Sequence, residues 1–125
     1  MSILVFIADD HAIVRDGLAA LLRTHPDIEI VGTAANGSDA LEQVKRLRPR
    51  VVILDISIPN MDGIEAARQI RLALPDTAIL ILSMHSGTQY VVQALEAGAR
   101  GYLLKESASM EIVAAVRAVD GGSAT

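Results

Sequence analysis

The sequence predicts an α/β fold with a single doubly wound, five-stranded parallel sheet in the order 2-1-3-4-5 and five helices. Five short aliphatic runs alternate with segments whose apolar residues recur at helical spacing, which is typical of parallel strands joined by right-handed helical crossovers. One run carries a charged residue, which favours a strand at an edge of the sheet. The length of 125 residues, 51% of them hydrophobic and 21% charged, fits one domain with a substantial core.

Four of the predicted strands are nearly uninterrupted aliphatic segments, as expected where helices cover both faces of a sheet. They are residues 3–8, 51–54, 78–82 and 101–104. The remaining run, at 28–32, has Glu29 in its middle. Of the common doubly wound layouts, the 2-1-3-4-5 order places this second strand at an edge.

Five segments between these runs place apolar side chains on one face of a helix. Their marking residues are Val14, Leu18, Leu21 and Leu22; Leu41, Val44 and Leu47; Ile64, Ala67, Ile70 and Leu74; Thr88, Val91, Val92 and Leu95; and Ile112, Val113, Val116 and Val119. Ser38 is expected to cap the second helix, and Asp62 with Glu65 has the pattern of a capping box for the third. Residues 1–120 are expected to form the domain and 121–125 the start of a linker.

Composition excludes several classes of function. The absence of cysteine removes disulfides, thiolate metal sites and cysteine nucleophiles. With 11 Lys and Arg against 15 Asp and Glu, the net charge of -4 argues against direct binding of nucleic acid. No apolar run approaches the roughly 20 residues of a membrane span, and the N-terminus lacks the cationic start of a signal peptide. A cytoplasmic domain without membrane contact is therefore expected.

Polar side chains follow four of the predicted strands: Asp9 and Asp10, Asp55, Ser83, and Lys105. Each alone is explained by the polarity of a chain leaving a core, but the carboxyl ends of parallel strands meet at one edge. Three carboxylates gathered there would repel one another unless a cation joined them, and one lysine is insufficient. Mg²⁺ is the simplest candidate, because it prefers oxygen ligands and the chain lacks the histidine spacing of zinc sites.

Asp55 ends the central strand, where a carboxylate can act as the nucleophile of phosphoryl transfer. The metal and Lys105 would neutralise charge on the phosphoryl oxygens, and Ser83 could donate a hydrogen bond to one of them. Binding of Mg²⁺ alone would need neither the hydroxyl nor the ammonium group. The set of residue types therefore favours phosphoryl transfer onto Asp55.

The pattern of these residues resembles the receiver domain of bacterial two-component response regulators. It consists of the N-terminal acid pair, D-x-x-x-P-x-x-D-G from Asp55 to Gly63, LS at a strand end, and ALEAGARGYLLK ending at Lys105. The resemblance covers essentially the whole chain, and the variants ADDH, LSMH and GYLLK are most similar to the NarL/FixJ (LuxR-type) family. It implies a flavodoxin-like receiver fold and a phosphorylation-gated domain of a transcription regulator.

The resemblance also implies roles for individual residues. Asp55 would be the phosphoacceptor, Ser83 and Lys105 would contact the phosphoryl group, and Tyr102 would turn inward when Ser83 moves. The implied Mg²⁺ site has the carboxylates of Asp10 and Asp55 and the backbone carbonyl of Ser57 as direct ligands. Asp9 would hold the metal through water. A sensor histidine kinase would be the phosphoryl donor. The face formed by the fourth helix, the strand at 101–104 and the fifth helix would switch and favour a homodimer. DNA would be bound only through a C-terminal helix-turn-helix domain outside this chain.

The sequence departs from the receiver pattern at two positions. Met84 follows Ser83 where many members carry a small residue, and this bulk could narrow access to Asp55. Glu106 follows Lys105 where many members carry proline, which bears on the cis peptide bond expected there.

Other functions remain open on the sequence alone. A hydrolase with an aspartyl nucleophile would usually have a second acid two residues later, where this chain has Ser57. A flavin-binding protein would need more than 2% aromatic residues for stacking. A dimerisation module that is never phosphorylated would not need all five site positions filled. His11 is expected to start a helix rather than bind a metal, and His85 to lie at the site entrance or on the surface.

Overall fold

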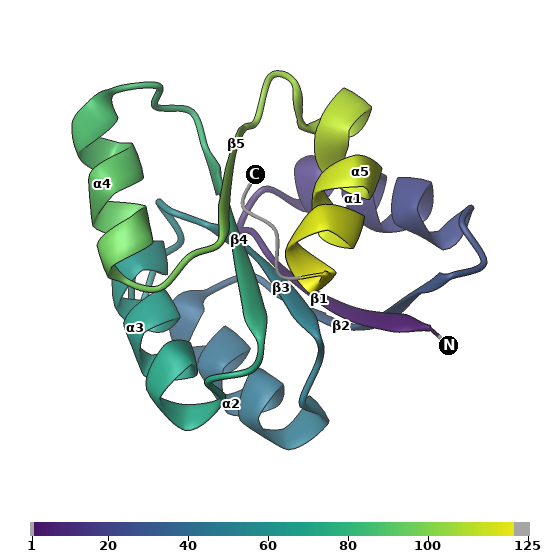
Figure 1. The fold of residues 1–125 in the computed structure, drawn as a ribbon, viewed down its shortest axis with the longest axis horizontal. Coiled ribbons are helices and arrows are strands. Elements are labelled where there is room, and N and C mark those ends of the chain that lie inside the picture. Colours follow the sequence, from purple (N-terminus) through teal and green to yellow (C-terminus); the bar gives the residue numbers. More distant parts are fainter. Residues whose placement is uncertain (1, 122–125) are drawn as a thin grey trace.

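The computed structural model describes residues 2–121 and confirms the predicted topology (Figure 1). Five parallel strands lie in the order β2-β1-β3-β4-β5. The strands are β1 (Ile3–Ala8), β2 (Ile28–Ala34), β3 (Val51–Asp55), β4 (Ala78–Ser83) and β5 (Gly101–Leu104). The helices are α1 (Ala12–Arg23), α2 (Gly37–Leu47), α3 (Gly63–Ala73), α4 (Thr88–Glu96) and α5 (Ala108–Asp120).

The sheet separates two hydrophobic cores. On one face α1 and α5 pack on alternate strand residues such as Val5 and Ile7, and on the other α2, α3 and α4 pack on Phe6 and Ala8 (Figure 1). Every residue of β3 and β4 is buried, as expected for central strands covered on both sides. The edge strand β2 exposes Glu29, which confirms its predicted place.

The prediction that Ser38 caps the second helix is wrong. Asn36 is the N-cap of α2, and its side chain accepts a 2.8 Å hydrogen bond from the backbone N–H of Asp39. The helix starts earlier than expected because Gly37 brings its backbone against the loop before α3, where a Cβ atom would overlap the carbonyl oxygen of Met61. At α3 one half of the predicted capping box forms, since Asp62 accepts a 2.9 Å hydrogen bond from the N–H of Glu65. The Glu65 carboxylate instead accepts a 2.9 Å hydrogen bond from the side chain of Gln69.

The fourth helix forms where predicted, but most of its marking side chains do not enter the core. Val92 and Leu95 of α4 are exposed, and Ala94 is the buried residue of the helix. Ala97 and Ala99, which follow the helix, are buried in the same core. The small alanines allow α4 to lie close to the sheet, and its larger aliphatic side chains therefore point outward.

Helix α5 runs from the carboxyl edge of the sheet back to the amino edge. It begins just after Lys105 and ends at Asp120, whose carboxylate lies 2.8 Å from the guanidinium of Arg50 at the start of β3. Arg100 fastens the same end by donating a 3.2 Å hydrogen bond to the carbonyl of Val119. The predicted linker residues 122–125 lie outside the described residues. Within residues 2–121, none of the helices combines the length and apolar character needed to cross a membrane.

Candidate functional site

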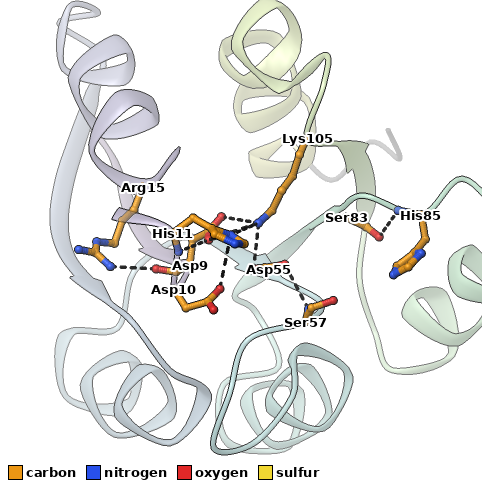
Figure 2. A network of polar contacts seen from close by, with 9 residues as sticks. All are labelled: Asp9, Asp10, His11, Arg15, Asp55, Ser57, Ser83, His85 and Lys105. Atoms are coloured by element: carbon orange, nitrogen blue, oxygen red, sulfur yellow. Dashed lines mark hydrogen bonds and ion pairs between the residues drawn. The ribbon is translucent and has the colours of Figure 1, made fainter. Parts of the chain in front are cut away.

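The carboxyl ends of β1, β3 and β5 bring two buried carboxylates and an ammonium group into direct contact (Figure 2). Lys105 Nζ lies 3.1 Å from Asp55 Oδ2 and 3.1 Å from Asp9 Oδ2. Asp9 is 0% exposed and Asp55 is 1% exposed, while the side chain of Lys105 is 11% exposed. Residues about 50 and 100 positions apart in the sequence thus form one buried ionic cluster, as their places after parallel strands predicted.

Asp55 is held by the loop that follows it. The backbone N–H of Ser57 donates a 3.1 Å hydrogen bond to Asp55 Oδ1, whereas Oδ2 faces Lys105. Gly63 N–H donates to the carbonyl of Ile56, which folds the start of α3 back against the end of β3. A Cβ atom on Gly63 would overlap the carbonyl oxygen of Asp55 and lie 2.6 Å from Cα of Ile56. The absence of a side chain at position 63 therefore allows the loop to close behind Asp55.

Asp9 is fixed along its backbone and at one carboxylate oxygen. Arg15 donates a 2.9 Å hydrogen bond to the Asp9 carbonyl, and the N–H of His11 donates a 2.8 Å bond to Oδ1. Oδ2 is buried without a hydrogen-bond partner in the part of the chain described, although Lys105 Nζ is close to it. A buried carboxylate oxygen of this kind is suited to accept a cation.

His11 lies in the cluster as well as at the start of α1. It is the N-cap residue, as predicted, but its side chain makes no capping bond. Its Nδ1 atom lies 3.0 Å from Lys105 Nζ, 3.3 Å from Asp9 Oδ1 and 3.6 Å from Asp10 Oδ1. The sequence predicts His11 as a helix-start residue, and the structure shows in addition that its ring contacts Lys105. The signal was its position directly after the acid pair, because α1 starts at the same edge of the sheet.

The cluster has the composition of a cation site. Asp9, Asp10, His11 and Asp55 each offer one ligand atom, and these atoms all lie within 4.8 Å of one another. Three of the four are carboxylates, the ligand type that hard divalent cations prefer. Oδ2 of Asp9 is buried and accepts no hydrogen bond, although it is ion-paired with Lys105; this supports the same conclusion, so the residues present fit a bound metal ion.

Ser83 belongs to the same edge but its hydroxyl is turned toward the next loop (Figure 2). It is fully buried, and Oγ accepts a 2.9 Å hydrogen bond from the backbone N–H of His85. The hydroxyl of Tyr102 donates a 2.6 Å bond to the carbonyl of the same residue. Tyr90 of α4 stacks on the His85 ring, with centroids 4.2 Å apart. The two candidate switch residues, Ser83 and Tyr102, therefore meet at His85 rather than at Asp55.

Both departures from the receiver pattern lie beside the cluster. Met84 is 77% exposed and, with Lys105 and Glu106, lines a cavity of about 430 Å³ next to Ser83. The cavity reaches Val14 of α1 and Leu104 of β5, so an approaching group would meet an apolar wall. No peptide bond within residues 2–121 is cis, and the expected cis bond after Lys105 is therefore replaced by a trans bond.

Burial and pairing act in opposite directions on the ionisation of the cluster. Burial raises the pKa of Asp55, Asp9 raises it further, and the bonds from Ser57 and Lys105 lower it, with a net upward shift. Burial alone would lower the pKa of Lys105, but its hydrogen bonds to Asp55 and Asp9 raise it above its usual value overall. Lys105 therefore remains a cation at neutral pH, while ionised Asp55 is held at an energetic disadvantage.

We expect Asp55→Asn to stabilise the fold at neutral pH by about 0.5–2 kcal/mol. A raised pKa means that the folded state binds the proton more tightly than the unfolded state, so wild-type stability falls as pH rises from 3.8 through the folded pKa. Below that interval Asp and Asn are both neutral, and the difference should vanish. Urea denaturation of both proteins across pH measures it. Asp76→Asn, an exposed carboxylate before β4, is the matched control; equal gains from both variants would contradict the argument.

Comparison with known proteins agrees with the fold. The family model of the response regulator receiver domain matches residues 5–117. The oxygen regulatory protein NreC of Staphylococcus epidermidis is 44% identical over 119 residues, and the uncharacterized transcriptional regulatory protein YhcZ of Bacillus subtilis is 43% identical over 118. Each alignment covers 94% of this chain but 55% of the relative, so the chain spans about half the length of these regulators.

A solved structure extends the same relationship to three dimensions. A LuxR-family two-component response regulator from Aurantimonas sp. SI85-9A1 superimposes with a TM-score of 0.93 at 35% identity, covering 99% of this chain and 89% of that one. The family match over most of the chain, the close relatives and the shared fold agree with one another. This chain therefore belongs to the response regulator receiver domains, and its relatives are the NarL/FixJ (LuxR-type) transcriptional regulators.

Proposed function

We propose that Asp55 accepts a phosphoryl group from a sensor histidine kinase in a Mg²⁺-dependent reaction, and that the domain thereby controls a DNA-binding output domain. The observation that carries the proposal is the contact of Asp55 Oδ2 with Lys105, in a buried cluster shared with Asp9. The names of the two relatives, a transcriptional regulatory protein and an oxygen regulatory protein, support the regulatory role. The kinase, the output domain and a cytoplasmic location are part of the proposal.

The chemistry proposed for Asp55 is a displacement at phosphorus. A carboxylate oxygen of Asp55 forms the new O–P bond as the P–N bond of the kinase phosphohistidine breaks and the imidazole leaves. Lys105, already within 3.1 Å of Oδ2, would neutralise charge on the phosphoryl oxygens. Mg²⁺, when bound, would supply further neutralisation of those oxygens. Its proposed direct ligands are the carboxylates of Asp10 and Asp55 and the backbone carbonyl of Ser57, with Asp9 holding it through water.

The proposed switch begins with the hydroxyl of Ser83. Phosphorylation places new charge and acceptor oxygens on Asp55, and Ser83 can donate to one of them once it leaves the N–H of His85. Tyr102 is bound to the same residue through the His85 carbonyl, so a shift of this loop requires its hydroxyl to find another partner. The two arrangements of the α4-β5-α5 face would then differ in free energy, and the phosphorylated one would favour a homodimer.

An enzyme that turns over external phosphate esters is less well supported. Ser57 occupies the position at which such an enzyme would place its general acid, and its hydroxyl is a poor proton donor near neutral pH. The Bacillus subtilis relative YhcZ is described as a transcriptional regulatory protein. We therefore propose that the domain catalyses only its own phosphorylation and dephosphorylation at Asp55.

Incubation of the purified domain with acetyl phosphate and Mg²⁺ is expected to add one phosphoryl group, detected by intact-protein mass spectrometry. Chelation of the metal should abolish the modification, because Lys105 is then the one cation of the cluster left to neutralise the carboxylates and the phosphoryl oxygens. Asp55→Asn should remain unmodified, whereas Asp76→Asn should behave as wild type. Modification of the Asp55→Asn variant, or no modification of wild type by any small donor or by phosphorylated kinase, would refute the proposal.

A further inference from the structure

His85 is held by three contacts from three different elements. Its N–H is bound by Ser83 at the end of β4, and its carbonyl by Tyr102 of β5. Its ring stacks on Tyr90 of α4 with an interplanar angle of 11°. We call these four residues the His85 cluster: Ser83, His85, Tyr90 and Tyr102. The roles implied by the receiver pattern account for Ser83 and Tyr102, but not for the ring contact.

The stack is the anchor of the loop on the side of α4. Tyr90 is half-buried and packs against the core beneath α2, α3 and α4, so its ring has a fixed backing. Gly87, the N-cap of α4, approaches the Tyr90 ring closely enough that a Cβ atom would lie 3.4 Å away. The loop from 84 to 87 is otherwise exposed along its length. Its conformation therefore depends on the three contacts that hold His85.

We propose that Tyr90 is a positioning residue that sets how readily Ser83 can reach phosphorylated Asp55. The stack stabilises the conformation in which the Ser83 hydroxyl is bonded to the N–H of His85. Any ligand that draws Ser83 toward Asp55 must work against this contact, and its apparent affinity is reduced accordingly. The inference rests on the proposed function, because it assumes that Ser83 engages a group attached to Asp55.

The test compares two variants of the same ring. Tyr90→Leu removes the aromatic face, while Tyr90→Phe keeps it and serves as the matched control. With beryllofluoride and Mg²⁺ as the probe, titration calorimetry is expected to show about 2- to 10-fold tighter binding for Tyr90→Leu, the range given by loss of one aromatic pair. Tyr90→Phe should bind as wild type does, since it keeps the aromatic ring that stacks on His85.

A second pair of variants separates positioning from a general loss of packing. His85→Leu removes the ring but keeps both backbone hydrogen bonds, and it should tighten binding to the same extent. The double variant should gain nothing further, because both changes remove one and the same contact. If Tyr90→Leu does not fold, His85→Leu carries the test by itself.

The outcomes distinguish the inference from the function on which it rests. If wild type binds beryllofluoride but Tyr90→Leu and His85→Leu bind it no more tightly than wild type does, the proposed role of Tyr90 is wrong. The phosphoacceptor proposal would remain intact. Lower thermal stability of both variants with unchanged affinity would show that the stack is merely structural. If wild type does not bind beryllofluoride, or if Asp55→Asn binds it equally well, the proposed function itself fails.

Discussion

Lys105→Met is expected to lower the free energy of unfolding at neutral pH by about 3 kcal/mol, because it leaves two buried carboxylates without the ammonium group between them. Asp9 and Asp55 are almost completely removed from solvent, so water cannot replace the lost cation. Protonation of one carboxylate removes its charge, so the loss of stability caused by Lys105→Met should become smaller as pH falls. Chemical denaturation at several pH values measures both effects.

The source of this loss can be tested with a double-mutant cycle. Asp55→Asn should stabilise the Lys105→Met background by at least about 1 kcal/mol more than it stabilises wild type, because it then removes one of two carboxylates left without a cation. Lys45→Met, which removes an exposed ammonium on α2, is the matched control and should change stability by less than about 0.5 kcal/mol. If the effects of the two substitutions on the free energy of unfolding are strictly additive, the contact between Lys105 and Asp55 contributes nothing to stability.

Gly63→Ala is expected to destabilise the fold by about 2–3 kcal/mol and to slow phosphorylation of Asp55 by about tenfold to a hundredfold. The added methyl group would meet the backbone of Asp55 and Ile56, and neither can move without displacing the end of β3. The carboxylate would then shift relative to Lys105, whose position is set by β5. Acetyl phosphate kinetics and urea denaturation measure the two losses.

Gly17→Ala is the matched control for this substitution. Gly17 lies inside α1, and an added Cβ would have no neighbour within 4 Å. Alanine there should stabilise the protein by about 0.5–1 kcal/mol and leave phosphorylation unchanged. If Gly63→Ala keeps wild-type stability and phosphorylation kinetics, the backbone at the end of β3 can move to accommodate the methyl group, and the prediction is wrong.

The topology and the place of the site followed from the sequence for a simple physical reason. Buried parallel strands are short and aliphatic, and each ends where the chain meets polar residues at one edge of the sheet. Asp9, Asp55 and Lys105 can be predicted to lie together because their placement depends on strand order and not on side-chain conformation. The structure shows in addition that the ammonium group of Lys105 lies 3.1 Å from an oxygen of each of the two carboxylates.

Side-chain directions could not be predicted in the same way. The ring of His11 contacts a lysine 94 residues away, and nothing local to the first helix reports that contact. The hydroxyl of Ser83 points to His85 because the following loop is anchored by Tyr90 and Tyr102, which come from separate elements. The N-cap of α2 could not be predicted for a related reason, because the start of this helix packs against Met61 in the loop between β3 and α3.

The course of α5 has a practical consequence for sensor engineering. The helix has 13 residues, which separates its two ends by about 20 Å. Its first turn adjoins Lys105, while its last residue is fastened at the opposite rim by Arg50. A fluorescent reporter fused after position 121 would therefore sit remote from the chemistry and report only a rigid tilt of the whole helix. A dye attached at exposed Met84, replaced by cysteine, would instead register local rearrangement beside Ser83.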